Sequence, residues 1–217
     1  MRKLCNYSLG FLVLQVVFGI CIARGQDRES PGVKGRHEFC SPDGTLVGTV
    51  VSLKQKIYGL DPSRIEIRDN KGHLVAIRNH SMAPNQGLTV VQAAWTKDSR
   101  FFVYKTVQSG GHEPINDPSF FYSREKHRFY ILNSSLSALG GGNGWIDGGF
   151  KLRSPSKVDI IADCYGESRE GLSIRINPKD PEGDRFVEID LKWLETRLTK
   201  KDASTDGEDR KCRVSEK

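Results

Sequence analysis

The chain has 217 residues, of which 37% are hydrophobic and 28% are charged. This composition is typical of a soluble globular protein and excludes a multi-span membrane protein, a collagen-like repeat and a wholly disordered chain. The net charge of +6 is not concentrated in a cluster of Lys and Arg in the body of the chain. Nucleic acid is therefore not expected as a partner, because phosphate binding needs several cationic contacts close together.

Residues 1–25 predict a secretory signal peptide. Two basic residues precede the apolar run Leu9–Ala23, which is too short for the roughly 30 Å hydrocarbon core of a membrane. Small residues two apart predict cleavage after Gly25. Two alternatives stay open: the run remains as an uncleaved anchor, or Cys21 is lipidated. The expected location is periplasmic or secreted, with no membrane span after cleavage.

Composition divides the remaining chain into three parts. Residues 26–36 are polar and predict a flexible leader, residues 37–199 predict a single β domain, and residues 200–217 predict a charged tail. Within the domain, apolar and polar residues alternate or form short apolar runs, which indicates strands. The runs are 46–53, 65–67, 88–94, 100–106, 129–132, 158–164, 172–176 and 187–191. Leu191, Leu194 and Leu198 have helical spacing and predict one C-terminal helix.

A turn sequence recurs before three of these strands. Ser41-Pro42-Asp43-Gly44 leads into the first, and Thr96-Lys97-Asp98-Ser99 follows fifty-five residues later. Proline, aspartate and glycine each favour a tight turn that launches a strand. A third copy, Ser154-Pro155-Ser156-Lys157, lacks both the aspartate and the glycine.

The segment from Ala94 to Tyr104, with sequence AWTKDSRFFVY, resembles the opening of a β-propeller blade. It is most similar to WD-repeat-like blades such as those of the periplasmic Tol-system propeller. The segments Ser41–Val51 and Ser63–Val75 have the same order of a turn, a strand and a second strand. Three units are fewer than the usual ring of six or seven blades. The expected fold is therefore all-β, either a short array of antiparallel blade-like sheets (an incomplete propeller) or a β-sandwich. The resemblance implies partner binding, and no catalytic residue carries over.

Export places Cys40, Cys164 and Cys212 in an oxidising compartment. We predict a Cys40–Cys212 disulfide, because both residues lie in polar stretches at the ends of the domain. Cys164 is in phase with the apolar face of 158–164 and is expected to be a buried thiol. The main competitor is Cys164–Cys212. Cysteine and histidine spacing shows no metal site, and no cofactor is expected.

Two loops supply the candidate binding residues. Trp145 follows the glycine-rich run Gly140–Gly144 and precedes Asp147, and it is expected to be at least partly exposed, whereas Trp95 is expected in the core. His112 follows Ser109-Gly110-Gly111. A flexible hairpin is the simpler interpretation of the first loop, and a mobile binding loop with Trp145 as its aromatic contact is the functional one.

The absence of a recognisable catalytic set favours a non-enzymatic function. The main hypothesis is an exported bacterial envelope protein that binds a protein or another envelope macromolecule through loops at one end of a β scaffold. The alternative is an envelope serine-type hydrolase that uses Ser109 and His112. A small-molecule sensor that uses Trp145 is a third possibility.

Overall fold

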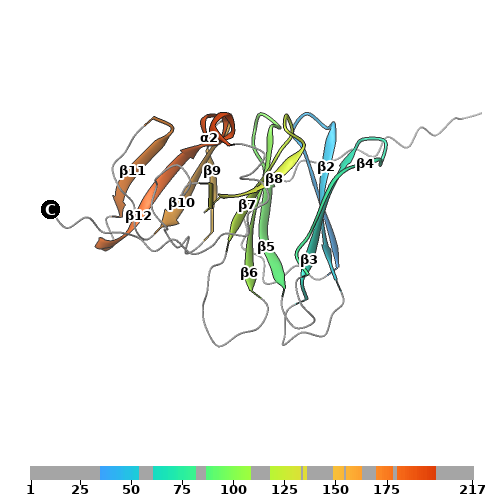
Figure 1. Cartoon of the computed structure of the whole chain (residues 1–217), viewed down its shortest axis with the longest axis horizontal. Coiled ribbons are helices and arrows are strands. Elements are labelled where there is room, and N and C mark those ends of the chain that lie inside the picture. Colours follow the sequence, from blue (N-terminus) through green and yellow to red (C-terminus); the bar gives the residue numbers. More distant parts are fainter. Residues whose placement is uncertain are drawn as a thin grey trace, which may run out of the picture.

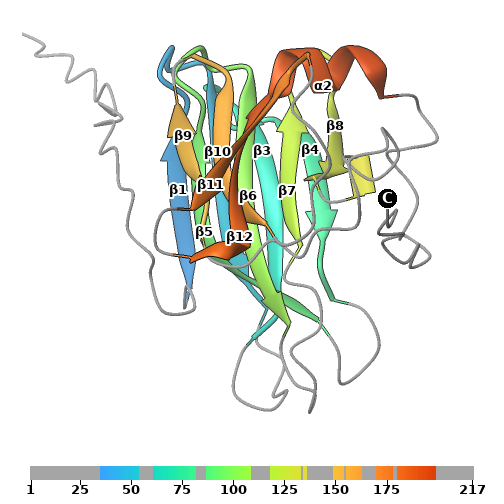
Figure 2. The ribbon, with the colours of Figure 1, turned by 90° about the vertical axis from the view of Figure 1, so that its left-hand side faces the viewer.

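The computed structural model describes residues 35–53, 61–81, 87–108, 118–132, 134–135, 149–153, 155–162, 170–177 and 180–198, with the backbone alone for 161–162, 176–177 and 180–186. These residues form three antiparallel four-stranded sheets and a short helix. The sheets stand face to face in an open row (Figure 1). Seen along the row, their strands run in roughly the same direction (Figure 2). The expected all-β array with one C-terminal helix is confirmed.

Each sheet is built from consecutive strands. The first sheet has the order β1-β2-β3-β4 and contains β1 (Arg36–Cys40), β2 (Leu46–Ser52), β3 (Ser63–Asp69) and β4 (Leu74–Asn79). The middle sheet has the order β5-β6-β7-β8 and contains β5 (Leu88–Trp95), β6 (Phe101–Gln108), β7 (Ser119–Ser123) and β8 (Arg128–Ile131).

The third sheet departs from this simple meander. Its order is β11-β12-β10-β9, and it contains β9 (Lys151–Arg153), β10 (Lys157–Ala162), β11 (Leu172–Asn177) and β12 (Asp180–Asp190). Because β10 and β11 both pair antiparallel with β12, they run in the same direction. The helix α2 (Leu191–Arg197) follows β12 directly.

The predicted repeat of turns is confirmed at the level of individual bonds. The backbone N–H of Ser41 donates to Leu46 O at 2.8 Å, and that of Thr96 donates to Phe101 O at 2.8 Å. Each hydroxyl also donates to the aspartate two residues later, at 2.7 Å in both turns. The third copy closes a shorter connection, since Arg153 pairs directly with Lys157.

The two aspartate turns also link neighbouring sheets. Asp43 of the first turn accepts a hydrogen bond from Arg124, which follows β7 of the middle sheet. Asp98 of the second turn lies 3.0 Å from the ammonium group of Lys192 in α2, beside the third sheet. The turns therefore help to connect neighbouring sheets, in addition to preceding a strand.

Two apolar cores fill the spaces between the sheets. Alternation along β6 sends Phe102 and Tyr104 toward the first sheet and Phe101 and Val103 toward the third. The first core joins the middle sheet to Val50, Ile65 and Ile67 of the first sheet and includes Trp95, which is 7% exposed as expected for a core tryptophan. The middle sheet is thus covered on both faces.

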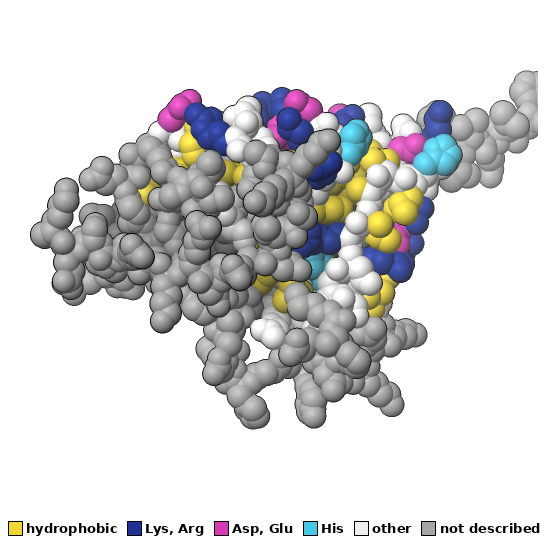
Figure 3. Space-filling model, viewed as in Figure 1, with side chains coloured by type: hydrophobic (Ala, Val, Ile, Leu, Met, Phe, Trp, Pro, Cys, Tyr) yellow, Lys and Arg dark blue, Asp and Glu magenta, His cyan; other side chains and the backbone are white. Residues whose placement is uncertain are grey.

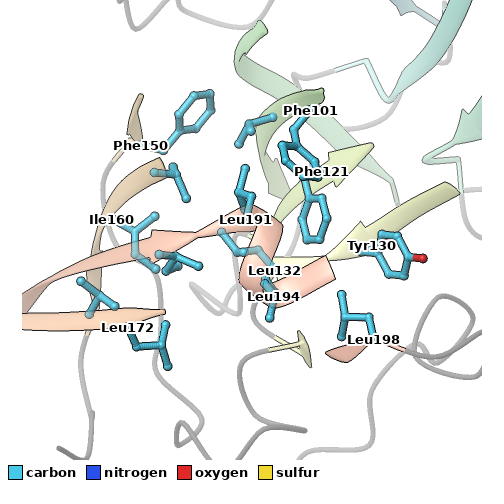
Figure 4. Packing of buried hydrophobic residues seen from close by; sticks show 14 residues of the cluster. Phe101, Phe121, Tyr130, Leu132, Phe150, Ile160, Leu172, Leu191, Leu194 and Leu198 are labelled. Atoms are coloured by element: carbon cyan, nitrogen blue, oxygen red, sulfur yellow. The ribbon is translucent and has the colours of Figure 1, made fainter. Parts of the chain in front are cut away.

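The second core lies between the middle sheet, the third sheet and α2. Phe101 and Phe121 pack with Leu191 and Leu194 of the helix (Figure 4). The helix is capped by Asp190, whose carboxylate accepts bonds from two backbone N–H groups of the first turn. Its predicted leucine face is therefore confirmed.

A buried polar contact fixes α2 against the middle sheet. The carboxylate of Glu195 is buried; it accepts a hydrogen bond from the hydroxyl of Ser123 and lies 3.2 Å from a guanidinium nitrogen of Arg100. Since all three polar groups are occupied, the contact does not leave an unpaired charge in the interior.

The two outer faces of the row carry the same kind of charged cluster. On the first sheet, buried Glu66 lies between Arg64 at 2.7 Å and Arg68 at 2.8 Å. On the third sheet, buried Asp159 lies between Arg153 at 2.7 Å and Arg175 at 3.3 Å. Both terminal faces are therefore polar where the inner faces are apolar, as is usual for the ends of stacked repeats.

Cys40 lies at the end of β1. The other cysteines lie outside the described residues, so the Cys40–Cys212 disulfide stays a prediction. None of the helices in the described part of the chain is long and apolar enough to cross a membrane.

Candidate binding surface

The binding residues predicted from the sequence all lie outside the described residues: His112, Trp145 and Asp147. The same holds for Ser109 of the hydrolase alternative. Their roles stay predictions. In the described ranges, no group of three or more metal-binding side chains comes together. The described surface offers a different candidate, on strand β4.

Strand β4 exposes apolar side chains at one edge of the first sheet. Leu74 is 48% exposed and Ile77 is 50% exposed, and no other large hydrophobic side chain in the described ranges is exposed. They pair with Arg68 and Glu66 respectively, so they lie on the outer face of the sheet with these two residues. Figure 3 shows hydrophobic surface beside basic side chains in the region where Figure 1 places β4.

One edge of β4 has no neighbouring strand in the described part of the chain, where β4 pairs only with β3; this edge is called the free edge below. The N–H of His80, just after β4, donates to Ser63 O at 3.1 Å. Hydrogen-bonded pairs alternate along an antiparallel ladder, so Arg78 and Ala76 also bond toward β3. The N–H and C=O groups of Ile77 and Asn79 therefore point to the free edge.

The opposite edge of the same sheet is protected. Strand β1 carries Arg36 and Glu38, which are exposed and form an ion pair at 3.0 Å. Charged side chains on an edge strand discourage pairing with another strand. Strand β4 has Leu74, Val75, Ala76 and Ile77 in succession and lacks such protection over these four residues.

A charged cluster borders the apolar residues on the outer face. Burial raises the pKa of the Glu66 carboxyl, but the hydrogen bond from Arg68 and the charges of Arg64 and Arg68 outweigh this and hold the pKa below its usual value. Glu66 is therefore ionised at neutral pH and already has two partners. Thr49, opposite Glu66 on β2, is fully buried with no partner for its hydroxyl oxygen.

Arg78 is the cation on β4 itself. Its guanidinium carbon lies 4.8 Å from the centre of the Phe120 ring, a cation–π contact with the middle sheet. Its Nε is buried and makes no hydrogen bond, and no described carboxylate pairs with it. Arg78 is therefore a partly buried charge without an acidic partner in the described part of the chain.

The neighbour of Arg78 on the same inner face is a neutral histidine. The buried ring of His80 shares a hydrogen bond of 3.1 Å with the hydroxyl of Tyr104, and its centre is 4.8 Å from that of Phe120. Burial, helped by the charge of Arg78, lowers the pKa of His80 to about 3. Burial also raises the pKa of Tyr104. Neither group carries a charge at neutral pH.

Positive charge predominates around β4. Asp69, the last residue of β3, forms an ion pair with His73 at 2.9 Å, and Glu66 is paired with its two arginines. The same region contains four cations against these two paired carboxylates: Arg64, Arg68, Lys71 and Arg78. The surface is therefore apolar at its centre and basic at its border.

The sequence analysis did not predict a strand at 74–79. The pairing of β4 with β3 is irregular beside Ile67 and Arg68, so the adjacent residues Val75 and Ala76 both pack on the core. This removes the period of two on which strand prediction depends. A short apolar run bounded by turn residues on both sides was the available signal.

Comparison of the chain with protein-family models, curated proteins and solved structures found no match.

Proposed function

We propose that the protein is a non-enzymatic binding module, exported to the bacterial periplasm or secreted, that binds a protein of the cell envelope. Export is supported by the basic and apolar pattern of residues 1–25. N-terminal sequencing of the protein isolated from cells is expected to find Gln26 first, and a cytosolic product that begins at Met1 would contradict export.

The observation that carries the proposal is the free edge of β4. It combines exposed Leu74 and Ile77, outward-pointing backbone groups of Ile77 and a cation, Arg78, that has no acidic partner among the described residues. An edge of this kind is costly to leave open, because it invites pairing with other chains. The opposite edge of the same sheet, at β1, is charged and protected, and this contrast supports a role of the β4 edge in recognition.

The test compares capture by the exported wild-type protein with capture by the variants I77K and E38P. In the ladder between β1 and β2, the N–H of Ser52 donates to Gly35 O at 2.7 Å. Because hydrogen-bonded pairs alternate, the N–H and C=O groups of Glu38 point to the outer edge of β1, just as those of Ile77 point to the free edge of β4. E38P is therefore the matched control. Each protein is immobilised and exposed to envelope extract, and retained proteins are purified and titrated.

We expect a retained protein that binds wild type and E38P saturably with one defined stoichiometry and binds I77K at least tenfold more weakly. Turnover of an ester substrate by the wild type that is abolished by H112A would contradict the proposal and favour the hydrolase.

A further inference from the structure

We propose that the partner adds an extended segment to the free edge of β4, and that this segment alternates apolar and acidic residues. The inference rests on the proposed function and specifies its surface and the chemistry of the partner. Addition of a strand to an exposed sheet edge is a general mode of peptide recognition, in which backbone bonds give affinity and alternate side chains give specificity.

The backbone supplies the pairing. Ile77 and Asn79 point their N–H and C=O groups away from β3, at the two-residue spacing of an antiparallel or parallel ladder. An incoming strand can therefore bond to both residues without displacing any bond of the first sheet. The pairing requires an extended partner with free N–H groups and excludes proline at the bonded positions.

The outer face specifies apolar side chains. Residues directly opposite each other in neighbouring strands share a face, so the partner residue opposite Ile77 lies beside Ile77 and near Leu74. Both side chains are about half exposed, at 50% and 48%. An apolar residue at this place covers them and removes apolar surface from water.

The inner face specifies a carboxylate. The partner residues on either side of the one opposite Ile77 point to the other face of the sheet. On that face Arg78 lies over Phe120, with a buried Nε that makes no hydrogen bond. Asp or Glu at this position would give the guanidinium the acidic partner that the described residues do not supply. The remaining cations, Arg64, Arg68 and Lys71, reinforce the preference for a negative strand.

A second copy of the chain fits this edge poorly. Pairing of β4 with another β4 would bring together two surfaces with the same excess of cations, and Glu66 and Asp69 on each copy are already paired. Like charges across neighbouring strands destabilise the pair. The charge distribution therefore favours a different, acidic segment.

The experiment uses three labelled octapeptides, flanked by Ser-Gly, with the exported wild-type protein. One peptide alternates Val and Glu, one has the same residues in two blocks, and one alternates Val and Lys. Binding is measured by fluorescence anisotropy at low and high salt. We expect the alternating Val-Glu peptide to bind at least tenfold more tightly than the other two, with weaker binding at high salt.

Four variants locate the contact. I77P removes the outward N–H at a position where the ladder to β3 does not need it, I77K keeps the N–H and adds a charge, and R78Q removes the cation. Each is expected to weaken binding of the Val-Glu peptide at least tenfold, whereas E38P on β1 is expected to leave it unchanged. Circular dichroism and thermal unfolding confirm that each variant is folded.

Several results would overturn the inference. Equal binding of the Val-Glu and Val-Lys peptides would show that charge does not select the partner. A concentration-dependent dimer that I77K abolishes would identify a second copy as the occupant. Capture of an envelope protein that persists in folded I77P and I77K would place the contact elsewhere: the protein would still be a binding module, but the β4 edge would not be its binding surface. Failure of every peptide and of envelope capture would remove both proposals.

Discussion

The indole N–H of Trp95 donates to the backbone carbonyl oxygen of Phe39 at 2.8 Å and so joins β5 of the middle sheet to β1 of the first. The same ring packs on Phe102 at 5.2 Å between centres and on Tyr122 at 6.4 Å. One side chain therefore combines a hydrogen bond between sheets with a large part of the first core.

Replacement of Trp95 by alanine is expected to reduce the free energy of unfolding by about 3–5 kcal/mol, because it removes a buried ring and leaves a cavity. W95F keeps most of the ring contacts and is expected to cost less, mainly through the lost hydrogen bond. Urea unfolding measures both. W145A is the comparison predicted from sequence, at about 1 kcal/mol or less; equal losses for W95A and W145A would contradict the core assignment.

His80 is expected to make stability fall in mild acid. Its pKa is about 3 in the folded protein and 6.5 ordinarily, so the unfolded chain binds the extra proton throughout this interval. Stability from the neutral ring is complete above about pH 6.5 and decreases as the pH falls toward 3, by up to about 1.4 kcal/mol per pH unit.

Urea unfolding of wild type and H80Q at pH 7 and pH 5 tests this. We expect the loss between the two pH values to be about 2 kcal/mol smaller in H80Q, following the same slope. H73Q, at an exposed histidine that pairs with Asp69, is the control. Identical pH dependence in wild type and H80Q would show that His80 protonates freely in the folded protein.

Gly48 on β2 is expected to tolerate alanine poorly. A Cβ at this position would lie 2.7 Å from Cε2 of Phe102, and that ring is held by Trp95 and Tyr104. We expect G48A to cost about 2–3 kcal/mol through overpacking.

Gly44 gives the matched comparison for Gly48. It has open space around a Cβ but a φ of +68°, so G44A is expected to cost only about 1 kcal/mol of backbone strain. Chemical denaturation ranks the two variants, and a larger loss for G44A would mean that Phe102 moves aside.

A disulfide between Cys40 and Cys212 is expected, with Cys164 left as a thiol. Non-reducing peptide mapping identifies the partner. A cross-linked peptide that contains Cys164 would refute the pairing. If it forms, the Cys40–Cys212 bridge is expected to stabilise the protein by about 5 kcal/mol in the entropic model, because the closed loop is long. Reduction followed by urea unfolding measures this contribution.

The sequence was most informative where structure is local. Ser41 and Asp43, and their counterparts Thr96 and Asp98, predicted two turns because each aspartate accepts bonds from residues within two positions of it. Alternation and short apolar runs together predicted most strands. The C-terminal helix was predicted from the spacing of three leucines, and its capping aspartate lies directly before it.

The candidate surface depends on contacts that local patterns do not record. Arg78 contacts Phe120 from another sheet, and Glu66 is buried on a face that alternation alone assigns to solvent. The order of the third sheet was equally inaccessible, because strand pairing there joins segments that are not consecutive. These features follow from packing, which a single sequence does not display.

The carboxylates held between arginines at the two ends of the row also limit how the fold can grow. Glu66 and Asp159 are already buried, but the arginines on either side of each are still partly exposed. Covering either outer face with another sheet would remove these guanidinium groups from water as well, and such desolvation is rarely repaid by the ion pairs themselves. A gene that duplicated the turn-and-strand unit would first have to replace these charges. Enlargement by stacking is thus obstructed, whereas lengthening a sheet sideways at β4 requires no change of sequence.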